Sequence, residues 1–320
     1  MSSPMGGLDA ETFAWDHRIY RYIFLSGLTV LFYDHLLTLG TEIPTIWLSK
    51  LRPSTVWFLG VRYLALVASA AICVFYFGNL SPEVFHHPPS FGVLTLHPPS
   101  CSTMERGLEG LLLTQEALVE FTLTLRVFAM YGLNLWISTS MGLVGGVAGG
   151  LGLWTVIKYG HPQMLSMPGL TGCHTAIPRD TALRSAYAWL AQFSLDLIVF
   201  GLTVYCAYRD RSAIRYVPGS LVERMARDGA MYFGIIVLAN LANVLTLFLG
   251  DIIIAGILSW WTTSLSVTLI CRLMLNLQRA GVGAQRENFE STELTGIHFV
   301  EPNAPAQRAQ DDGLDSLADV

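Results

Sequence analysis

Seven apolar stretches, each close to the length of about 20 residues that a bilayer-spanning helix needs, lie between residues 20 and 277 of the 320-residue chain. Apolar runs of this length indicate transmembrane helices. Charged residues make up only 13% of the chain, against about 25% in soluble domains. We therefore predict an all-α fold, a seven-helix membrane bundle with helices near residues 20–40, 54–78, 108–131, 133–157, 184–208, 229–250 and 252–277.

The apolar stretches divide the chain into three parts. Residues 1–19 precede the first helix, residues 20–277 form the membrane domain, and residues 278–320 form a polar, acidic tail that ends in DDGLDSLADV. This composition is typical of a disordered segment. The N-terminus lacks the basic and apolar regions of a signal peptide, so we expect the first helix to direct insertion itself.

Lysine and arginine set the predicted orientation, because the cytoplasmic connections of membrane proteins carry the excess of both. The connection at residues 209–228 is the most basic one. We therefore expect the N-terminus outside and the tail in the cytoplasm, in the plasma membrane or an endomembrane. The basic connection also contains apolar residues and is a candidate contact for a cytoplasmic signalling partner, although ordinary positive-inside charge explains it more simply. With no basic patch elsewhere, we expect the lipid bilayer and no nucleic acid as partner.

Two of the five cysteines fall in predicted connections. Cys101 precedes the third helix and Cys173 lies between the fourth and the fifth, both on the predicted outer side. An oxidising compartment permits a disulfide there, and we expect one between these two residues. The other cysteines lie within predicted helices, where we expect them to pack as small apolar residues.

Residues 21–67 carry a distinctive series of motifs. They include Tyr33-Asp34, Leu36-Leu37-Thr38, Glu42, Ile46-Trp47 and Arg62-Tyr63. This stretch resembles the module of fungal multi-pass membrane proteins called domain of unknown function 6533. The later Arg227-Asp228-Gly229, Tyr232-Phe233, Asn243 and Arg272–Leu277 resemble the C-terminal half of those proteins. The resemblance implies a membrane protein and no particular activity. His35 and Gly40 stand where the resemblance leads us to expect an aromatic residue and an acid.

Charged residues within the predicted helices are candidates for function, because burying a charge in a membrane is costly. Asp34 and Arg62 each lie about 9–13 Å from the same end of neighbouring antiparallel helices, at about 1.5 Å per residue. We therefore predict an ion pair between them, with His35 and Tyr63 nearby. Such a pair either fixes helix pairing or takes part in function.

A second set of polar residues lies near mid-membrane on four predicted helices. Glu116 and Glu120, four residues apart, share one helix face. We expect them to face the polar residues of three other helices in the bundle interior. The candidate ligand-pocket residues are Glu116, Glu120, Asp196, Asn240, Asn243 and Thr263. A pocket between helices is the usual place for such a cluster; interhelical hydrogen bonds alone are the simpler explanation.

The fourth predicted helix carries glycines at Gly142, Gly146 and Gly150, with Gly145 and Gly149 between them. Such small-xxx-small repeats allow close approach of helix backbones. We expect this face to pack within the bundle.

Several known chemistries are missing from the sequence. Neither lysine lies in the last predicted helix, which excludes a retinal Schiff base there, and the third helix has Leu125-Arg126-Val127 rather than Asp-Arg-Tyr. No HExxH, G-x-S-x-G or P-loop motif occurs. We expect no metal site, no cofactor and no catalytic residues, which favours a protein that is not an enzyme.

The sequence leaves three classes of function open. A receptor-like protein or sensor with an intramembrane polar pocket for a small-molecule ligand is our leading hypothesis. A proton- or solute-coupled carrier using the same carboxylates is the alternative, although the chain lacks the inverted repeats and broken helices common in carriers. A membrane enzyme or a structural scaffold is the third.

Overall fold

The computed structural model describes residues 10–49, 52–77, 101–159, 163–164, 175–176, 179–209, 221–250 and 254–297. Within these ranges the chain forms seven α-helices, and the prediction of an all-α fold is confirmed. The helices are α1 (Ala10–Glu42), α2 (Pro53–Phe77), α3 (Cys101–Met130), α4 (Leu135–Tyr159), α5 (Arg179–Arg209), α7 (Leu221–Leu249) and α8 (Ser259–Ile297). A π-helix, η1 (Ile43–Trp47), follows α1. The short strands β1 (Gln163–Met164) and β2 (Thr175–Ala176) pair antiparallel.

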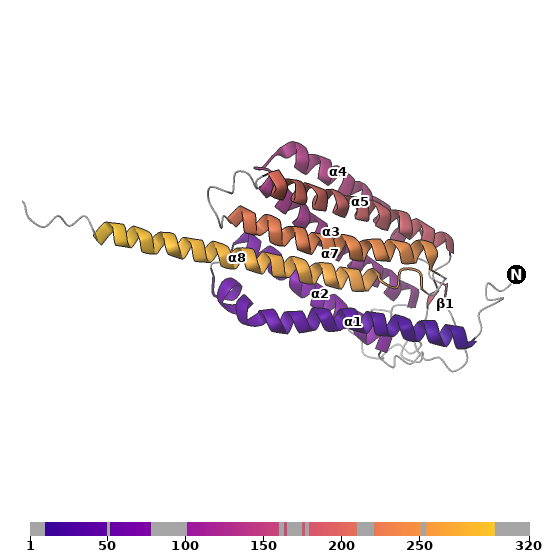
Figure 1. Ribbon diagram of the computed structural model, residues 1–320. Coiled ribbons are helices and arrows are strands. Elements are labelled where there is room, and N and C mark those ends of the chain that lie inside the picture. Colours follow the sequence, from indigo (N-terminus) through magenta and orange to yellow (C-terminus); the bar gives the residue numbers. More distant parts are fainter. Residues whose placement is uncertain are drawn as a thin grey trace, which may run out of the picture. The chain divides into compact units, whose positions relative to one another are not determined.

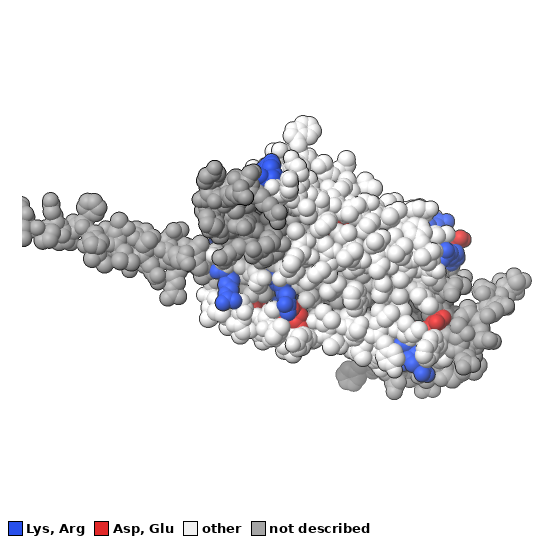
Figure 2. All heavy atoms as spheres, in the orientation of Figure 1, with Lys and Arg blue, Asp and Glu red and all other residues white. Residues whose placement is uncertain are grey.

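Five of the described helices are long and apolar enough to cross a membrane, judged by length and composition: α1, α2, α4, α5 and α7. In the described part of α3 and α8, polar residues interrupt the apolar pattern, with Glu109, Glu116 and Glu120 in α3 and Arg272 in α8. On the face in Figure 2, most of the described charged side chains gather toward the ends of the helices and the middle is largely uncharged. The chain is therefore a membrane-spanning helical protein.

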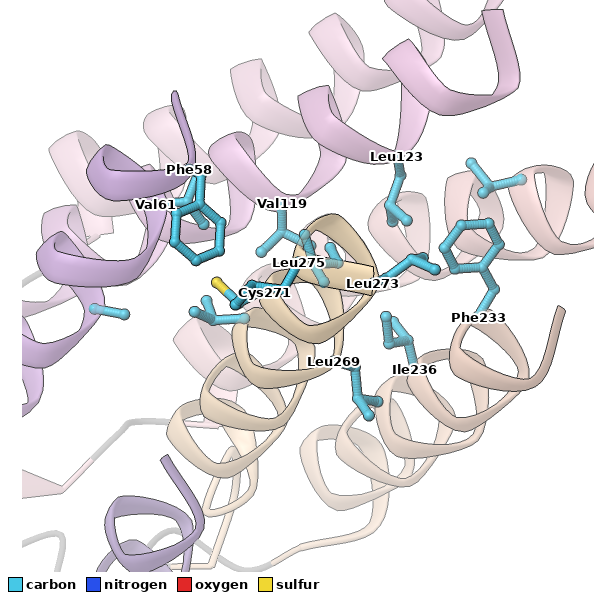
Figure 3. Close-up of a cluster of buried hydrophobic side chains, with 14 of the residues drawn as sticks. Phe58, Val61, Val119, Leu123, Phe233, Ile236, Leu269, Cys271, Leu273 and Leu275 are labelled. Atoms are coloured by element: carbon cyan, nitrogen blue, oxygen red, sulfur yellow. The ribbon is translucent and has the colours of Figure 1, made fainter. Parts of the chain in front are cut away.

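The residues up to Gln278 form one compact unit of antiparallel helices (Figure 1). In it α5 packs against α4 and α7, and α3 packs against α2, α4 and α5. The core is apolar and draws on every helix of the unit. Figure 3 shows side chains of α2, α3 and α7, among them Phe58, Leu123 and Ile236, around the part of α8 that holds Cys271 and Leu273. The first part of α8 is thus a central helix of the bundle.

The end of α1 changes from α-helix to π-helix at Pro44, whose ring nitrogen has no hydrogen to donate to the helix ladder. The following turn widens, and the backbone N–H of Leu48 bonds to the carbonyl of Ile43 at 3.1 Å, five residues back. In this turn the indole Nε1 of Trp47 donates to Oε1 of Glu42 at 3.1 Å. Because the helix continues to Glu42, that carboxylate lies inside the bundle and is fully buried.

The last helix differs most from the sequence-based expectation. It begins at Ser259 rather than near residue 252, because residues 254–258 form turns that include Gly256 at φ 74°. It continues to Ile297, so the prediction of a disordered tail from residue 278 is wrong for residues 279–297. That stretch contains Ala, Gln, Arg and Glu, which favour helix. Residues 279–320 form a second compact unit, and residues 298–320 lie outside the described residues.

The glycines of α4 form only part of the close helix contact that their spacing predicts. A Cβ atom added at Gly142, Gly146 or Gly150 would meet no atom of the described chain within 4 Å. Gly145, which belongs to the predicted set, does make a close contact, because a Cβ there would lie 3.3 Å from Leu195 of α5. Gly152, which was not predicted, makes a second one, because a Cβ there would lie 2.7 Å from Leu113 of α3. The helix is rotated so that Gly142, Gly146 and Gly150 are exposed, while Gly145 faces α5.

Candidate functional site

Three buried carboxyl groups lie together in the middle of the bundle. Glu116 and Glu120 follow each other by one turn of α3, which places them on the same face, and Asp196 comes from α5. All three side chains are buried among the helices. We call Glu116, Glu120 and Asp196 the acidic cluster. The sequence-based prediction placed these residues in one set, and the structure brings them together.

Each acid of this cluster accepts a hydrogen bond from an uncharged side chain. The hydroxyl of Thr263 in α8 donates to Glu116. The amide of Gln192 donates to Oε1 of Glu120 at 2.6 Å, and the amide of Asn240 in α7 donates to Oδ2 of Asp196 at 2.7 Å. Four helices therefore meet at the acidic cluster, and the predicted candidates Asn240 and Thr263 are in direct contact with it.

Asn243, the remaining predicted candidate, lies one turn along α7 from Asn240. Its Oδ1 accepts a hydrogen bond from Ser259 at 3.2 Å, which ties α7 to the beginning of α8. It is fully buried, and its amide nitrogen has no hydrogen-bond partner. Asn243 therefore extends the polar region from the acidic cluster toward the first turn of α8.

The acidic cluster retains acceptor atoms that nothing in the described chain satisfies. Oε2 of Glu116, Oε2 of Glu120, Oδ1 of Asp196 and Oδ1 of Asn240 are buried without a hydrogen-bond partner. An unsatisfied buried polar group costs about 1–3 kcal/mol, and more when it is charged. The ion pairs between described residues do not include these acids. The cluster is therefore short of hydrogen donors and of positive charge.

A second polar centre lies between α1, η1 and α2 and is organised around Arg62. Its guanidinium lies 2.9 Å from Oε2 of Glu42, and it also donates to the ring of His35 at 2.9 Å and to the hydroxyl of Thr38 at 2.6 Å. The hydroxyl of Tyr63 donates to Glu42 at 3.1 Å. Arg62 and Glu42 are both almost completely buried. Because each charge has a counter-charge and several hydrogen bonds, this centre is electrically balanced.

The same centre is tied to α8 by a further ion pair. Arg272 bonds to Asp34 of α1, which is itself buried while Arg272 is partly exposed. The predicted pair of Asp34 with Arg62 is therefore wrong, although His35 and Tyr63 do lie beside Arg62, as expected, and their rings meet edge to face. We call the residues Asp34, His35, Thr38, Glu42, Arg62 and Arg272 the ion-pair network.

The wrong pairing has a physical reason. Helix α1 continues to Glu42, two residues beyond the predicted end at residue 40, so a second acid enters the bundle next to Arg62. Asp34 therefore forms its ion pair with Arg272 of α8. The sequence analysis did not assign Glu42 or Arg272 a role. A signal existed for Arg272, because it is a charge inside a predicted helix and such a charge requires a partner.

Some predicted features cannot be compared with the structure. Cys173 lies outside the described residues, and so does the centre of the connection at residues 209–228. The disulfide with Cys101 and the signalling contact remain predictions. Cys206 and Cys271 are buried in helices α5 and α8, and Cys73 is partly buried in α2. In the described ranges, no three His, Cys, Asp or Glu side chains are arranged to hold a metal ion.

A comparison with protein families identifies one segment of the chain. Residues 22–67 match a family of unknown function, DUF6533. The DUF6533 segment covers most of α1, all of η1 and the first part of α2. It therefore contains every residue of the ion-pair network except Arg272, and none of the acidic cluster. A comparison with curated proteins gave no match.

Proposed function

We propose that this membrane protein is a receptor-like sensor whose ligand site is the acidic cluster, together with Asn240, Asn243 and Thr263. One observation carries the proposal: every acid of the cluster is held by an uncharged donor and keeps one buried oxygen without a partner. A positively charged ligand or a hydrogen donor would satisfy these atoms. A site that is incomplete without such a ligand is suited to sense it.

The position of the cluster supports a sensor rather than an enzyme. Its side chains come from α3, α5, α7 and α8, so binding changes hydrogen bonds between helices and alters how the helices pack. The cluster consists of acids, amides and hydroxyls without an activated nucleophile among the residues in contact with it. A change of helix packing is the signal that such an arrangement can produce.

The wider assignments belong to the same proposal. We place the N-terminus outside and the tail in the cytoplasm, with the connection at residues 209–228 as the contact for a signalling partner. We also assign the chain to the fungal multi-pass membrane proteins that carry the DUF6533 segment. The basic composition of the connection and the match to residues 22–67 support these assignments.

A proton-coupled carrier is the second candidate, and one observation favours it. Gln192, which donates to Glu120 of α3, precedes Asp196 by one turn of α5, so the carboxyl groups of Glu120 and Asp196 lie near each other across the α3–α5 interface. Adjacent acids within a membrane are the groups that carriers use to bind and release protons. The two candidates differ in whether the site passes its ligand across the membrane.

Proximity labelling tests the receptor-like function. A labelling enzyme is fused to the C-terminus of the wild-type chain and of Asp196→Asn, and the tagged proteins in the native cell are compared. We expect signalling proteins among them, in amounts that change several-fold in Asp196→Asn. The matched control is Asp180→Asn, which changes an exposed acid on the same helix and should label as wild type does. Labelling that is identical in all three, or confined to extracellular or lumenal proteins, contradicts the proposal.

Reconstitution into liposomes tests the carrier. The purified chain is placed in vesicles that contain a pH-sensitive dye, and a pH difference is imposed with candidate solutes present. A receptor-like protein leaves the dye signal equal to that of empty vesicles. Proton entry that depends on a solute and is lost in Asp196→Asn would establish the carrier in its place.

A further inference from the structure

Glu120 of α3 and Asp196 of α5 lie near each other, because Gln192, the donor to Glu120, precedes Asp196 by one turn of α5. This arrangement is unusual because both groups are acceptors when ionised. Gln192 already donates to Oε1 of Glu120, and Asn240 already donates to Oδ2 of Asp196. The other two oxygens, Oε2 of Glu120 and Oδ1 of Asp196, are buried and have no donor. Two carboxyl groups in contact with each other form a hydrogen bond only when one of them carries a proton.

We propose that the ligand of the acidic cluster is a proton, held between the carboxyl groups of Glu120 and Asp196. This inference rests on the proposed function, because it names the ligand of the same site. The bound proton supplies the missing donor, joins α3 to α5 and removes one negative charge from the buried cluster. Of the cationic ligands that the cluster could accept, a proton is the smallest and joins two carboxyl groups directly.

The surroundings of the pair favour a bound proton from every packed helix. On α3 the nearest charged group is Glu116, a third acid, and on α5 the neighbour is the neutral Gln192. Helix α7 contributes the amide of Asn240, and α8 contributes the hydroxyl of Thr263, which is engaged with Glu116. The described neighbours are therefore acids or neutral groups, and positive charge has to come from a ligand.

Loss of the proton has a direct structural consequence. Two carboxylates would then meet in a region of low dielectric, where like charges repel strongly. The contact between α3 and α5 is thus stable with the proton bound and destabilised without it. The two states of this contact would provide the change in helix packing that a sensor requires.

Infrared spectroscopy of the full chain in lipid nanodiscs at neutral pH tests the proposal. A protonated carboxylic acid has a carbonyl stretching band at higher frequency than a carboxylate, and the band shifts in deuterated water. We expect such a band in wild type and its loss in both Glu120→Gln and Asp196→Asn. Each amide offers an N–H in place of the proton, so we expect both variants to fold and to keep the α3–α5 contact.

Glu116→Gln is the matched control, because it removes an acid of the same helix face that is bonded to Thr263. We expect it to keep the band. The absence of the band in wild type overturns the proposal, as does a band that only Glu116→Gln removes. A band that is absent together with saturable stabilisation by sodium ions at constant ionic strength also overturns it, in favour of a bound metal cation.

The spectrum and the labelling experiment fail independently. A proton found at Glu120 and Asp196, with labelling that does not depend on Asp196, would uphold the proton site and contradict the receptor-like function. Labelling that depends on Asp196 without the carbonyl band would uphold the function and overturn the proton as ligand.

Discussion

The ion-pair network and the acidic cluster are both polar, both buried in one helical bundle, and opposite in their electrical balance. In the network, Arg62 faces Glu42 and Arg272 faces Asp34, so every charge has a counter-charge. In the acidic cluster, three acids have only amide and hydroxyl donors. A buried centre whose charges are balanced holds helices together, whereas a centre with unbalanced acids is suited to bind a cation or a hydrogen donor.

The largest expected effect comes from removing a charge of the balanced centre. Glu42→Gln leaves Arg62 buried without its counter-charge, and breaking a buried ion pair costs about 3–5 kcal/mol. We expect a marked fall in the thermal unfolding midpoint of the purified protein in detergent. Asp180→Asn, an exposed acid on α5, serves as the control and should leave the midpoint unchanged. A wild-type midpoint in Glu42→Gln would mean that the network is not balanced by this pair.

The next effect concerns the packing of α8 against α1, on which the network depends. A Cβ at Gly27 would lie 3.1 Å from the Cα of Trp261. This neighbour is a backbone atom, so it cannot relieve the clash by a change of rotamer as a flexible side chain can. Gly27→Ala should therefore destabilise the protein by about 1–3 kcal/mol through overpacking. The control is Gly146→Ala, where no atom lies within 4 Å. Equal unfolding midpoints for the two variants would contradict this close contact.

A smaller effect is expected at the partly exposed ion pair. Arg272 keeps 38% of its side chain exposed, so loss of its partner in Asp34→Asn should cost about 1 kcal/mol or less. The double variant Asp34→Asn/Arg272→Gln should lose no more free energy of unfolding than the two single variants lose together. It should lose less than this sum if the two side chains stabilise each other. A double variant that is less stable than this sum would show that the two side chains do not stabilise each other.

The smallest effect on stability is expected in the acidic cluster. The change is again from glutamate to glutamine, which is the change expected to destabilise the network most. Glu116→Gln keeps an oxygen for Thr263 and removes one negative charge from a site with excess negative charge. We expect the unfolding midpoint to stay constant or to rise by an amount that corresponds to less than about 0.5 kcal/mol. A fall comparable to that of Glu42→Gln would remove the distinction between the two centres.

The sequence predicted the membership of the acidic cluster but not the partners within the network. Polar residues on apolar helices have to face the interior, so Glu116, Asp196 and Asn240 were expected in one set, and they meet there. The ion pair of Asp34 with Arg272 depends on two structural features that the sequence does not clearly indicate. One is that α1 continues to Glu42, and the other is that Gly27 lets α8 lie close beside α1.

Helix ends and rotations explain the remaining differences. The apolar pattern of the sequence locates the part of a helix that lies in the membrane. It does not reveal polar turns that continue the helix past the apolar stretch, as residues 279–297 continue α8. The glycine stripe at Gly142, Gly146 and Gly150 was predicted from spacing alone. The direction in which it faces is set by the neighbours of α4, which contact Gly145, a residue of the predicted set, and Gly152, which was not predicted.

Helix α8 belongs to both polar centres. Thr263 contacts the acidic cluster, and Arg272 contacts Asp34 within the DUF6533 segment. The two residues are nine positions apart on one continuous helix, which is about 13.5 Å at about 1.5 Å per residue. A shift of this helix along its axis moves both contacts by the same distance. If ligand binding at the cluster shifts α8, the affinity for the ligand and the strength of the Asp34–Arg272 pair are reciprocally linked, each changing the other by the same free energy.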